Sequence, residues 1–311
     1  MGLLSVVIPS YNEEGNIENT VKVLSGILGE NAIDYELLFV NDGSSDKTYE
    51  LIEAESKKNN RVKGISFSRN FGKEASIFAG LQVAVGDCVV VMDCDLQHPA
   101  EIIPKMYKLW EEGFEVVEGI KSSRGKEGIF HKMCAGMFYN VMSKLIRMDM
   151  KSTSDFKLLD RKVVDVLLSL PEKNTFFRAL SFWVGFKTTK VEYDVAERKY
   201  GTTKWSFRSL MRYAINNATS FSVLPLQIVT VLGIVSILLS LVLGIQTLVK
   251  YFMGTAAEGF PTVILLILLI GGFIMLSLGI IGHYIGKIYE EVKGRPKYII
   301  RTHTDNIKGN I

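Results

Sequence analysis

Two long stretches without a charged residue limit what this chain can fold into. Tyr213–Val249 and Gly259–Gly286 contain no Asp, Glu, Lys or Arg. A helix needs roughly 20 apolar residues to cross a bilayer, and each stretch is longer than that. Core helices of soluble proteins rarely run so far without a charge. We therefore predict two transmembrane helices, at 223–250 and 261–286, with a short external loop at 251–260 between them.

Most basic residues near these stretches lie on one side of the predicted membrane, and only Lys250 lies beside the connection between the spans. The others precede the first span and follow the second: Lys204, Arg208, Arg212, Lys287, Lys293, Arg295, Lys297 and Arg301. Because basic residues flank membrane helices on the cytoplasmic side, we expect the part before the spans and the tail, 287–311, to be cytoplasmic. The net charge of +3 gives no reason to expect nucleic acid as a partner.

Residues 1–204 alternate short β-rich runs with polar helical stretches. The runs are Leu4–Ile8, Glu36–Val40, Val62–Phe67, Cys88–Met92 and Glu115–Gly119. The helical stretches begin near Glu14, Asp46, Gly72 and Pro99. This alternation predicts an α/β fold whose mainly parallel sheet is covered by helices on both faces. In such sheets, ligands bind at the carboxyl ends of the strands.

Further elements are predicted after this alternation. Apolar residues at helical spacing indicate a packing helix over 126–146. Phe156–Leu159 and Val191–Val195 indicate two more strands. A stretch rich in aromatic and basic residues, 205–222, precedes the first span and predicts an amphipathic helix in the membrane interface. The predicted order is thus a cytoplasmic α/β domain over 1–204, an interface helix, two spans and a tail.

Polar clusters follow the predicted strands. They are Pro9-Ser10-Tyr11-Asn12-Glu13, Asn41-Asp42-Gly43-Ser44-Ser45-Asp46, Ser68-Arg69-Asn70-Phe71-Gly72-Lys73 and Asp93-Cys94-Asp95. Asp93 and Asp95 offer oxygen ligands to Mg²⁺ or Mn²⁺ without filling its coordination shell, which leaves positions for diphosphate oxygens. Two aspartates at this spacing are also common in solvated turns, so this pair alone leaves both interpretations open.

A larger set of motifs narrows the interpretation. The three clusters Val6-Val7-Ile8-Pro9-Ser10-Tyr11-Asn12-Glu13, Val40-Asn41-Asp42-Gly43-Ser44-Ser45-Asp46 and Asp93-Cys94-Asp95-Leu96-Gln97-His98-Pro99 resemble, in this order, the signature of inverting family 2 glycosyltransferases with the GT-A fold. The Rossmann-like GT-A domain is α/β. Three later motifs, together with the two spans, resemble the bacterial polyprenyl-phosphate glycosyltransferases. They are Ser68-Arg69-Asn70-Phe71-Gly72-Lys73-Glu74, Ser154-Asp155-Phe156-Lys157-Leu158 and Arg198-Lys199-Tyr200-Gly201-Thr202-Thr203-Lys204-Trp205.

Those enzymes are relatives of dolichol-phosphate mannose synthase, and several glucosylate undecaprenyl phosphate (bactoprenol) in O-antigen modification. The resemblance implies a role for each matching residue of the donor site. Pro9, Tyr11, Glu13 and Lys73 would line the nucleotide-sugar pocket. Asp42 would meet the base of the nucleotide.

The resemblance also implies which groups act on the reacting atoms. Asp93 would lie near the ribose and diphosphate, and Asp95 would hold the metal together with Asp93. Asp155 would be the catalytic base. A phosphate monoester has its second pKa at about 6, so the acceptor is largely ionised at neutral pH and little base catalysis is needed. An orienting role for Asp155 therefore stays open.

The loop before the interface helix supplies two cations. Arg198 and Lys204 would meet a lipid phosphate or the leaving diphosphate, Arg through a planar fork and Lys as a point charge. The alternative is that these charges only set the topology. The chain departs from the family pattern at His98, where many relatives have Asp, and at Thr203, where many have Ser. We interpret His98 as a surface residue, and a metal-binding role is the less favoured alternative.

The predicted function is transfer of a sugar, with inversion, from a nucleotide diphosphate to polyprenyl phosphate at the bacterial inner membrane. It requires Mg²⁺ or Mn²⁺, and UDP-glucose is the expected donor. GDP-mannose, a UDP-aminosugar or a modified pentose stay open, because pocket shape decides specificity. A processive polysaccharide synthase is a rival, but this chain has no Gln-x-x-Arg-Trp motif. A non-catalytic membrane scaffold is a rival of another class, and the resemblance also suggests a homo-oligomer.

Overall fold

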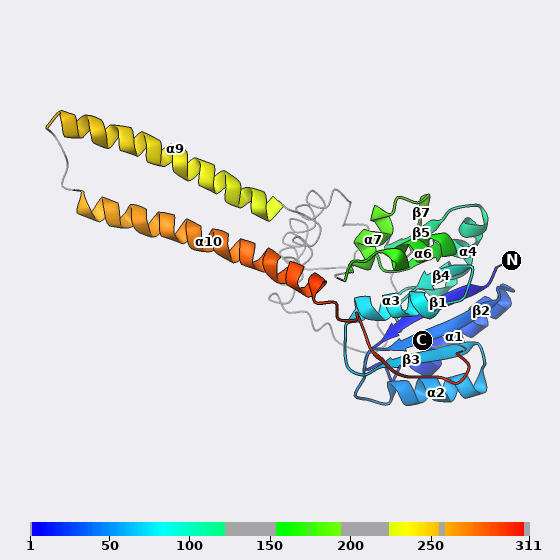
Figure 1. Ribbon diagram of the computed structural model, residues 1–311. Coiled ribbons are helices and arrows are strands. Elements are labelled where there is room, and N and C mark those ends of the chain that lie inside the picture. Colours follow the sequence, from blue (N-terminus) through cyan, green and yellow to red (C-terminus); the bar gives the residue numbers. More distant parts are fainter. Residues whose placement is uncertain (1, 122–153, 174, 194–223, 255–258, 308–311) are drawn as a thin grey trace. The chain divides into compact units, whose positions relative to one another are not determined.

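The computed structural model describes residues 2–121, 154–173, 175–193, 224–254 and 259–307 (Figure 1). The chain forms two compact units. One comprises the described residues of Met1–Phe207 and Pro296–Ile311, and the other comprises those of Arg208–Arg295. The first is an α/β unit and the second is helical, and each is described by itself.

The α/β unit is built on an eight-stranded sheet with the order β7-β5-β6-β4-β1-β2-β3-β8. The strands are β1 Leu4–Ser10, β2 Tyr35–Asn41, β3 Val62–Phe67, β4 Cys88–Val91, β5 Val116–Lys121, β6 Lys157–Asp160, β7 Thr188–Tyr193 and β8 Ile300–His303. Strands β4, β1, β2 and β3 run parallel, as do β5 and β7. Strands β6 and β8 are antiparallel to their neighbours. The prediction of a mainly parallel α/β sheet is confirmed.

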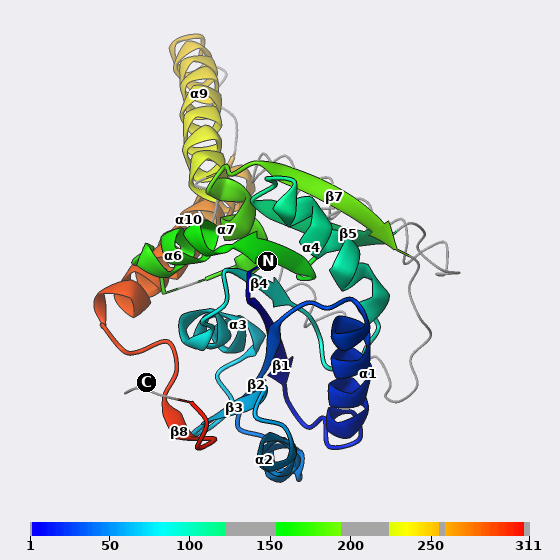
Figure 2. The ribbon, with the colours of Figure 1, turned by 90° about the vertical axis from the view of Figure 1, so that its right-hand side faces the viewer.

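Helices cover both faces of this sheet. They are α1 Ile17–Glu30, α2 Thr48–Lys58, α3 Lys73–Val83, the 3₁₀ turn η1 Ala100–Ile102, α4 Ile103–Glu111, α6 Arg161–Ser169 and α7 Phe177–Trp183. Alternate residues of β1 point to opposite faces, so Leu4 and Val6 join the core cluster that contains α1 and α4. Val7 points to the opposite face. A Cβ atom added to Gly80 of α3 would lie 2.2 Å from the Val7 side chain, so α3 packs closely against β1 on that face. Figure 2 shows α1 and α3 on opposite sides of β1 and β2.

The sequence predicted most of these elements. The five predicted runs correspond to β1 to β5, and the four helical stretches correspond to α1, α2, α3 and η1 with α4. The two later strands correspond to β6 and β7, with β7 beginning at Thr188 rather than Val191. Helices α6 and α7 and strand β8 were not predicted. The predicted helices at 126–146 and 205–222 lie outside the described residues.

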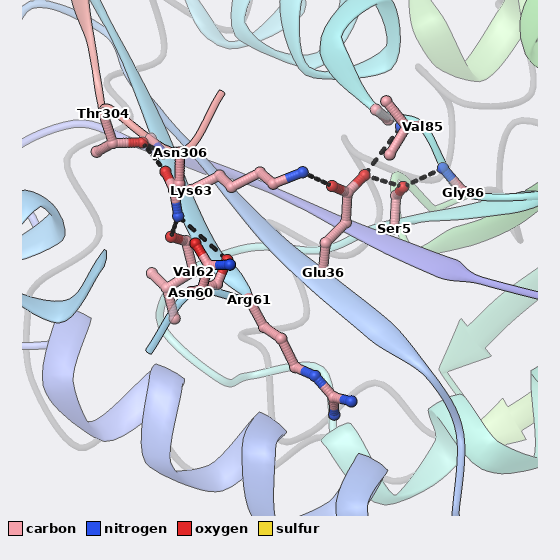
Figure 3. Close-up of polar contacts among 12 residues, drawn as sticks. Ser5, Glu36, Asn60, Arg61, Val62, Lys63, Val85, Gly86, Thr304 and Asn306 are labelled. Atoms are coloured by element: carbon pink, nitrogen blue, oxygen red, sulfur yellow. Dashed lines mark hydrogen bonds and ion pairs between the residues drawn. The ribbon is translucent and has the colours of Figure 1, made fainter. Parts of the chain in front are cut away.

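Strand β8 comes from the tail, which was predicted only as a cytoplasmic segment. It pairs antiparallel with β3 and extends the sheet at that edge. The contact continues past the strand, because Thr304 N–H donates to Gly64 O (2.9 Å) and the Gly64 N–H donates to Thr304 Oγ1 (3.0 Å). Asn306 Nδ2 donates to Val62 O (2.7 Å) and Asn60 O (3.1 Å), as Figure 3 shows. The tail is therefore part of the α/β unit.

A buried carboxylate ties the parallel strands together across the same region (Figure 3). Glu36 of β2 accepts hydrogen bonds from Ser5 Oγ of β1 (2.5 Å) and from the Val85 N–H (2.9 Å). Its second oxygen lies 2.6 Å from Lys63 Nζ of β3. Each oxygen of this buried charge has a partner, which is the condition under which a buried carboxylate is tolerated. Glu36 thus fixes three neighbouring strands and the turn before β4.

The helical unit contains two long apolar helices, α9 Leu224–Phe252 and α10 Phe260–Val292. The first predicted span lies almost wholly within α9, and the second lies within α10, which continues to Val292. Within them, Val229–Phe252 and Leu269–Val292 are long and apolar enough to cross a membrane. Their large apolar side chains are exposed, as Ile237 and Leu241 illustrate. Exposed apolar surface of this extent needs lipid or another protein to cover it.

We expect Asn306→Ala to destabilise the α/β unit by about 1–3 kcal/mol, because it leaves the carbonyls of Val62 in β3 and of Asn60 in the preceding turn without their side-chain donor. A domain of this size should then melt several degrees lower. The measurement is thermal unfolding in detergent followed by circular dichroism. Arg301→Ala is the control, since Arg301 lies on β8 with its side chain exposed. Equal melting of the two variants would contradict an anchoring role for Asn306.

Candidate active site

The carboxyl ends of β1 and β2 carry two loops that are joined by hydrogen bonds. Asn12 is in the left-handed region (φ 55°), and its N–H donates to Ser44 Oγ (2.9 Å) while its Oδ1 accepts from Ser45 N–H (3.0 Å). The Glu13 N–H donates to Thr48 Oγ1 (2.9 Å). Tyr11 is half exposed on this rim. Tyr11 and Glu13, which were predicted for the nucleotide pocket, therefore lie on a loop that is bonded to the residues after β2, and Pro9 lies at the end of β1 before it.

Asp42 holds the next loop in place. Its Oδ1 accepts from the Phe71 N–H (2.6 Å) and its Oδ2 from the Gly72 N–H (2.9 Å). Burial raises the pKa of this carboxyl, against the two N–H donors, which lower it. Gly43 beside it has φ +63°, and an added Cβ would lie 2.4 Å from the Arg69 carbonyl carbon, so only glycine fits there. Contact of Asp42 with a base stays a prediction.

Asp93 and Asp95 follow β4 with a strained turn after them. Leu96 has φ 53°, which is costly for a branched side chain, and the Gln97 N–H donates to Asp95 Oδ1 (3.1 Å) across it. Burial and then the carboxylates of Asp95 and Asp93 raise the pKa of Glu13, although a hydrogen bond from Asn16 opposes this. The charges of Asp95 and Asp93 thus reach Glu13, but among the described residues no three acidic, His or Cys side chains are placed to bind one metal ion. The two aspartates are the hard-oxygen type of ligand that Mg²⁺ and Mn²⁺ prefer, so the residue types fit the predicted metal.

Lys73, the first residue of α3, joins two of the predicted acidic residues. Its Nζ lies 2.5 Å from Asp93 Oδ1 and 3.0 Å from Asp155 Oδ2. Burial disfavours the ammonium, but the two carboxylates raise the pKa of Lys73 above its ordinary value. Asp93 is likewise held below its ordinary pKa by Lys73 and His98, although burial opposes this. Lys73 therefore stays a cation at the strand ends, where a diphosphate would need one.

Asp155 lies just before β6 and is almost fully buried. Arg178 of α7 binds it through two parallel contacts, Nε to Oδ1 at 2.6 Å and Nη2 to Oδ2 at 2.8 Å. Burial favours the neutral acid, but Lys73 and Arg178 hold the pKa of Asp155 well below its ordinary 3.8. A carboxylate with both oxygens engaged by cations is a poor proton acceptor. The arrangement favours the orienting role of Asp155 over that of a base.

Glu74 follows Lys73 in the chain and contacts α7, the helix that carries Arg178. Its Oε2 accepts from the Phe177 N–H (2.8 Å) at the beginning of α7. Burial, and then the Asp155 carboxylate, raise the pKa of Glu74 to about 7. The first two residues of α3 therefore bind both Asp155 and the helix that carries its arginine.

His98 was expected on the surface, and that expectation is wrong. The residue is 7% exposed and stacks on Phe156 with ring centroids 5.0 Å apart and planes 14° apart. Tyr193 meets both rings edge-on, at 5.8 Å and 5.7 Å. The imidazole is flat and apolar on its faces, so it fills an aromatic cluster that a charged aspartate could not fill in the same way. This cluster packs the segment after Asp95 against the residue after Asp155.

The structure thus brings together seven of the predicted site residues on described loops and strand ends: Pro9, Tyr11, Glu13, Asp42, Lys73, Asp93 and Asp95. Asp155 joins them through Lys73. Arg198 and Lys204 lie outside the described residues, and their roles stay predictions. Arg178 and Glu74 were missed. A buried carboxylate needs a cation, but the sequence does not say which arginine supplies it.

Comparisons with known proteins identify the family. A family model described as "Glycosyl transferase family 2" matches residues 5–165. An uncharacterised glycosyltransferase of Bacillus subtilis is 42% identical over 96% of this chain and 93% of its own length. A prophage-derived bactoprenol glucosyl transferase of Shigella flexneri is 38% identical over 97% of this chain and 99% of its own.

Among solved structures, the glucosyl-3-phosphoglycerate synthase of Mycobacterium tuberculosis, in complex with Mn²⁺, UDP and phosphoglyceric acid, has a similar fold. The TM-score is 0.53, with 20% identity over 70% of this chain and 76% of that one. The fold is that of a GT-A enzyme. The chain belongs to glycosyltransferase family 2.

We expect Glu74→Gln to stabilise the protein at high pH and to change it little at low pH. The pKa of Glu74 is about 7 in the folded protein against an ordinary 4.5, so folding favours its neutral form. That preference is fully satisfied below pH 4.5 and is lost as the pH rises through 7, which costs up to about 3 kcal/mol. Gln keeps an acceptor for the Phe177 N–H.

The measurement is the melting temperature of both proteins between pH 4.5 and 8.5. The difference between them should grow from about pH 4.5 to about pH 7 and level off above that. A constant difference across the whole range would contradict the raised pKa. Glu53→Gln, at an exposed pair with Lys57, is the control.

Proposed function

We propose that this enzyme transfers a sugar from a nucleotide diphosphate to the phosphate of a polyprenyl lipid, with inversion at the anomeric carbon. The donor is UDP-glucose and the acceptor is undecaprenyl phosphate. The observation that carries the proposal is the nearly full-length similarity to bactoprenol glucosyl transferases, which includes the apolar helices as well as the α/β unit. Fold similarity alone would not name an acceptor, because one fold serves many acceptors.

Asp93 and Asp95 are the residues that would hold a divalent cation. Their carboxylates, with Glu13 nearby, present oxygen ligands at the carboxyl end of β4. When bound, such a cation supplies Lewis-acid stabilisation of the charge that grows on a leaving diphosphate. Lys73 adds a second positive charge at the same strand ends. The solved relative that binds Mn²⁺ and UDP is consistent with this assignment.

The transfer is a single displacement. An oxygen of the lipid phosphate attacks the anomeric carbon, a new C–O bond forms, and the bond to the diphosphate oxygen breaks with its electron pair leaving on the nucleoside diphosphate. The lipid phosphate is largely ionised at neutral pH, so the protein does not need to remove a proton. Asp155, engaged by Lys73 and Arg178, orients these cations. Arg198 and Lys204 remain the proposed contacts for the lipid phosphate.

We further propose that α9 and α10 cross the cytoplasmic membrane and that both chain termini are cytoplasmic. The basic residues that flank the helices support this orientation. The pairing of β8 with β3 supports it independently, because β8 follows both helices in the chain while β3 precedes them. Two segments of one sheet lie in one compartment. The chain must therefore cross the membrane an even number of times between β3 and β8, and α9 and α10 would make two crossings.

The function is tested with UDP-[¹⁴C]glucose and undecaprenyl phosphate in detergent, counting label in the lipid fraction, with GDP-mannose as the alternative donor. We expect Asp95→Asn to lower the rate by a factor on the order of 100 to 1,000, since a bound metal supplies several kcal/mol. A chelator should silence the wild type and Mg²⁺ or Mn²⁺ should restore it. Asp165→Asn, at an exposed residue of α6, is the control. Full activity in excess chelator would contradict the metal assignment, and an unlabelled lipid fraction would contradict the acceptor.

Topology is tested with reporters fused after Ile311 and inserted within 255–258. The terminal reporter should report the cytoplasm and the inserted one the external side. Asn306→Ala carrying the same reporters is a useful comparison, since weaker pairing of the tail should not change the orientation of the helices. A terminal reporter on the external side would contradict both the two-span arrangement and the membership of β8 in the sheet.

A further inference from the structure

Helix α7 is held against the active site by three polar contacts along its length. Phe177 N–H donates to Glu74, Arg178 binds Asp155, and Ser181 Oγ accepts from Lys157 Nζ at 2.9 Å. Its apolar residues Phe177, Ala179 and Leu180 are buried beneath it. A seven-residue helix has little stability of its own, so these contacts decide where Arg178 lies.

The contact between Arg178 and Asp155 fixes a direction as well as a distance. Two parallel N–H to oxygen bonds, at 2.6 and 2.8 Å, hold the carboxylate in the plane of the guanidinium. The same Oδ2 that accepts from Arg178 also meets Lys73 Nζ at 3.0 Å. The carboxylate of Asp155 therefore cannot rotate without breaking at least one of these contacts.

The four charges alternate in a row. Arg178 binds Asp155, Asp155 binds Lys73, and Lys73 binds Asp93, which is one of the proposed metal ligands. If Arg178 were removed, Lys73 would be the one remaining cation at Asp155 among the described residues, and Asp155 would attract it more strongly. Since Lys73 is shared between the two aspartates, that shift would come at the expense of its contact with Asp93. A change at Arg178 would thus reach the donor site through Asp155.

The row differs from the purely structural ion pair beside it. Lys157 and Glu118 lie 3.2 Å apart and are 2% and 6% exposed, so that pair is sealed in the protein. Arg178 and Lys73 are 30% and 40% exposed. The carboxylate of Asp155 is thus shielded from solvent, whereas the two cations that bind it are partly exposed.

We propose that Arg178 is a positioning residue for the transfer reaction: it fixes the Asp155 carboxylate, which in turn holds Lys73 beside Asp93. This inference rests on the proposed function only for the identity of the acceptor. Arg178 acts through Asp155 and touches neither donor nor acceptor. Glu74 supports it by fixing the main chain of Phe177, one residue before it.

The test is a double-mutant cycle of Arg178→Ala and Asp155→Asn, read as kcat and KM for transfer to undecaprenyl phosphate. Loss of a bidentate charged contact should lower kcat about ten- to a hundredfold in Arg178→Ala. Because Arg178 acts through Asp155, the double variant should be no slower than Asp155→Asn alone. Arg178→Lys should recover only part of the rate, since an ammonium does not reproduce the fork. Guanidinium at millimolar concentration should partly rescue Arg178→Ala, because the site is open to solvent.

Each variant is also melted, and Arg61→Ala serves as the matched control, since Arg61 pairs with Asp34 at an exposed site. A loss in Arg178→Ala that multiplies with that of Asp155→Asn would overturn the proposal, because Arg178 would then contact substrate itself. A lowered melting temperature without guanidinium rescue would overturn it in favour of a structural role. The cycle is repeated on the slow hydrolysis of UDP-glucose, which needs no lipid. If the enzyme hydrolyses UDP-glucose but never labels lipid, the proposed acceptor is wrong. The double-mutant cycle can still be measured on the hydrolysis reaction in that case.

Discussion

The candidate active site depends on keeping a buried carboxylate charged. Asp155 lies almost out of solvent, where an unpaired carboxylate would cost several kcal/mol. Its two cations come from segments far apart in the chain, Lys73 at the beginning of α3 and Arg178 in α7. Satisfying this one charge therefore requires the parallel half of the sheet and the later helices to pack against each other. The ion pairs that set the geometry of the site therefore also stabilise the fold of the α/β unit.

The sequence predicted the parallel core well because a strand that is buried on both faces is mostly apolar. Strands β1 to β4 meet that condition closely enough to be recognised one by one. The strand-end residues were predictable for a related reason, since ligand-binding residues of such sheets follow the strands directly. Asp42, Asp93 and Asp95 all do so. In this part of the chain, the local sequence pattern also indicates where the residues lie in the fold.

The features that were missed are the ones fixed by distant partners. Strand β8 is four residues long, mostly exposed, and carries Arg301 and His303, so its composition does not indicate a strand. It forms because the edge of β3 offers it hydrogen bonds. His98 was misplaced for a similar reason, since its burial depends on Phe156 and Tyr193. Arg178 lies in a short helix, and the sequence of that helix does not indicate a contact with Asp155. In each case the decisive contact joins residues with no local relation in sequence.

The position of β8 in the chain also sets an order of events in biogenesis. During synthesis the N-terminal strands leave the ribosome first, and both apolar helices follow before β8 appears. Until then, β3 is an open sheet edge, which is the kind of surface on which unfinished chains associate. The β3 edge can be covered by β8 only after both apolar helices have been synthesised. The last strand of the α/β unit therefore cannot form before the whole helical segment has left the ribosome.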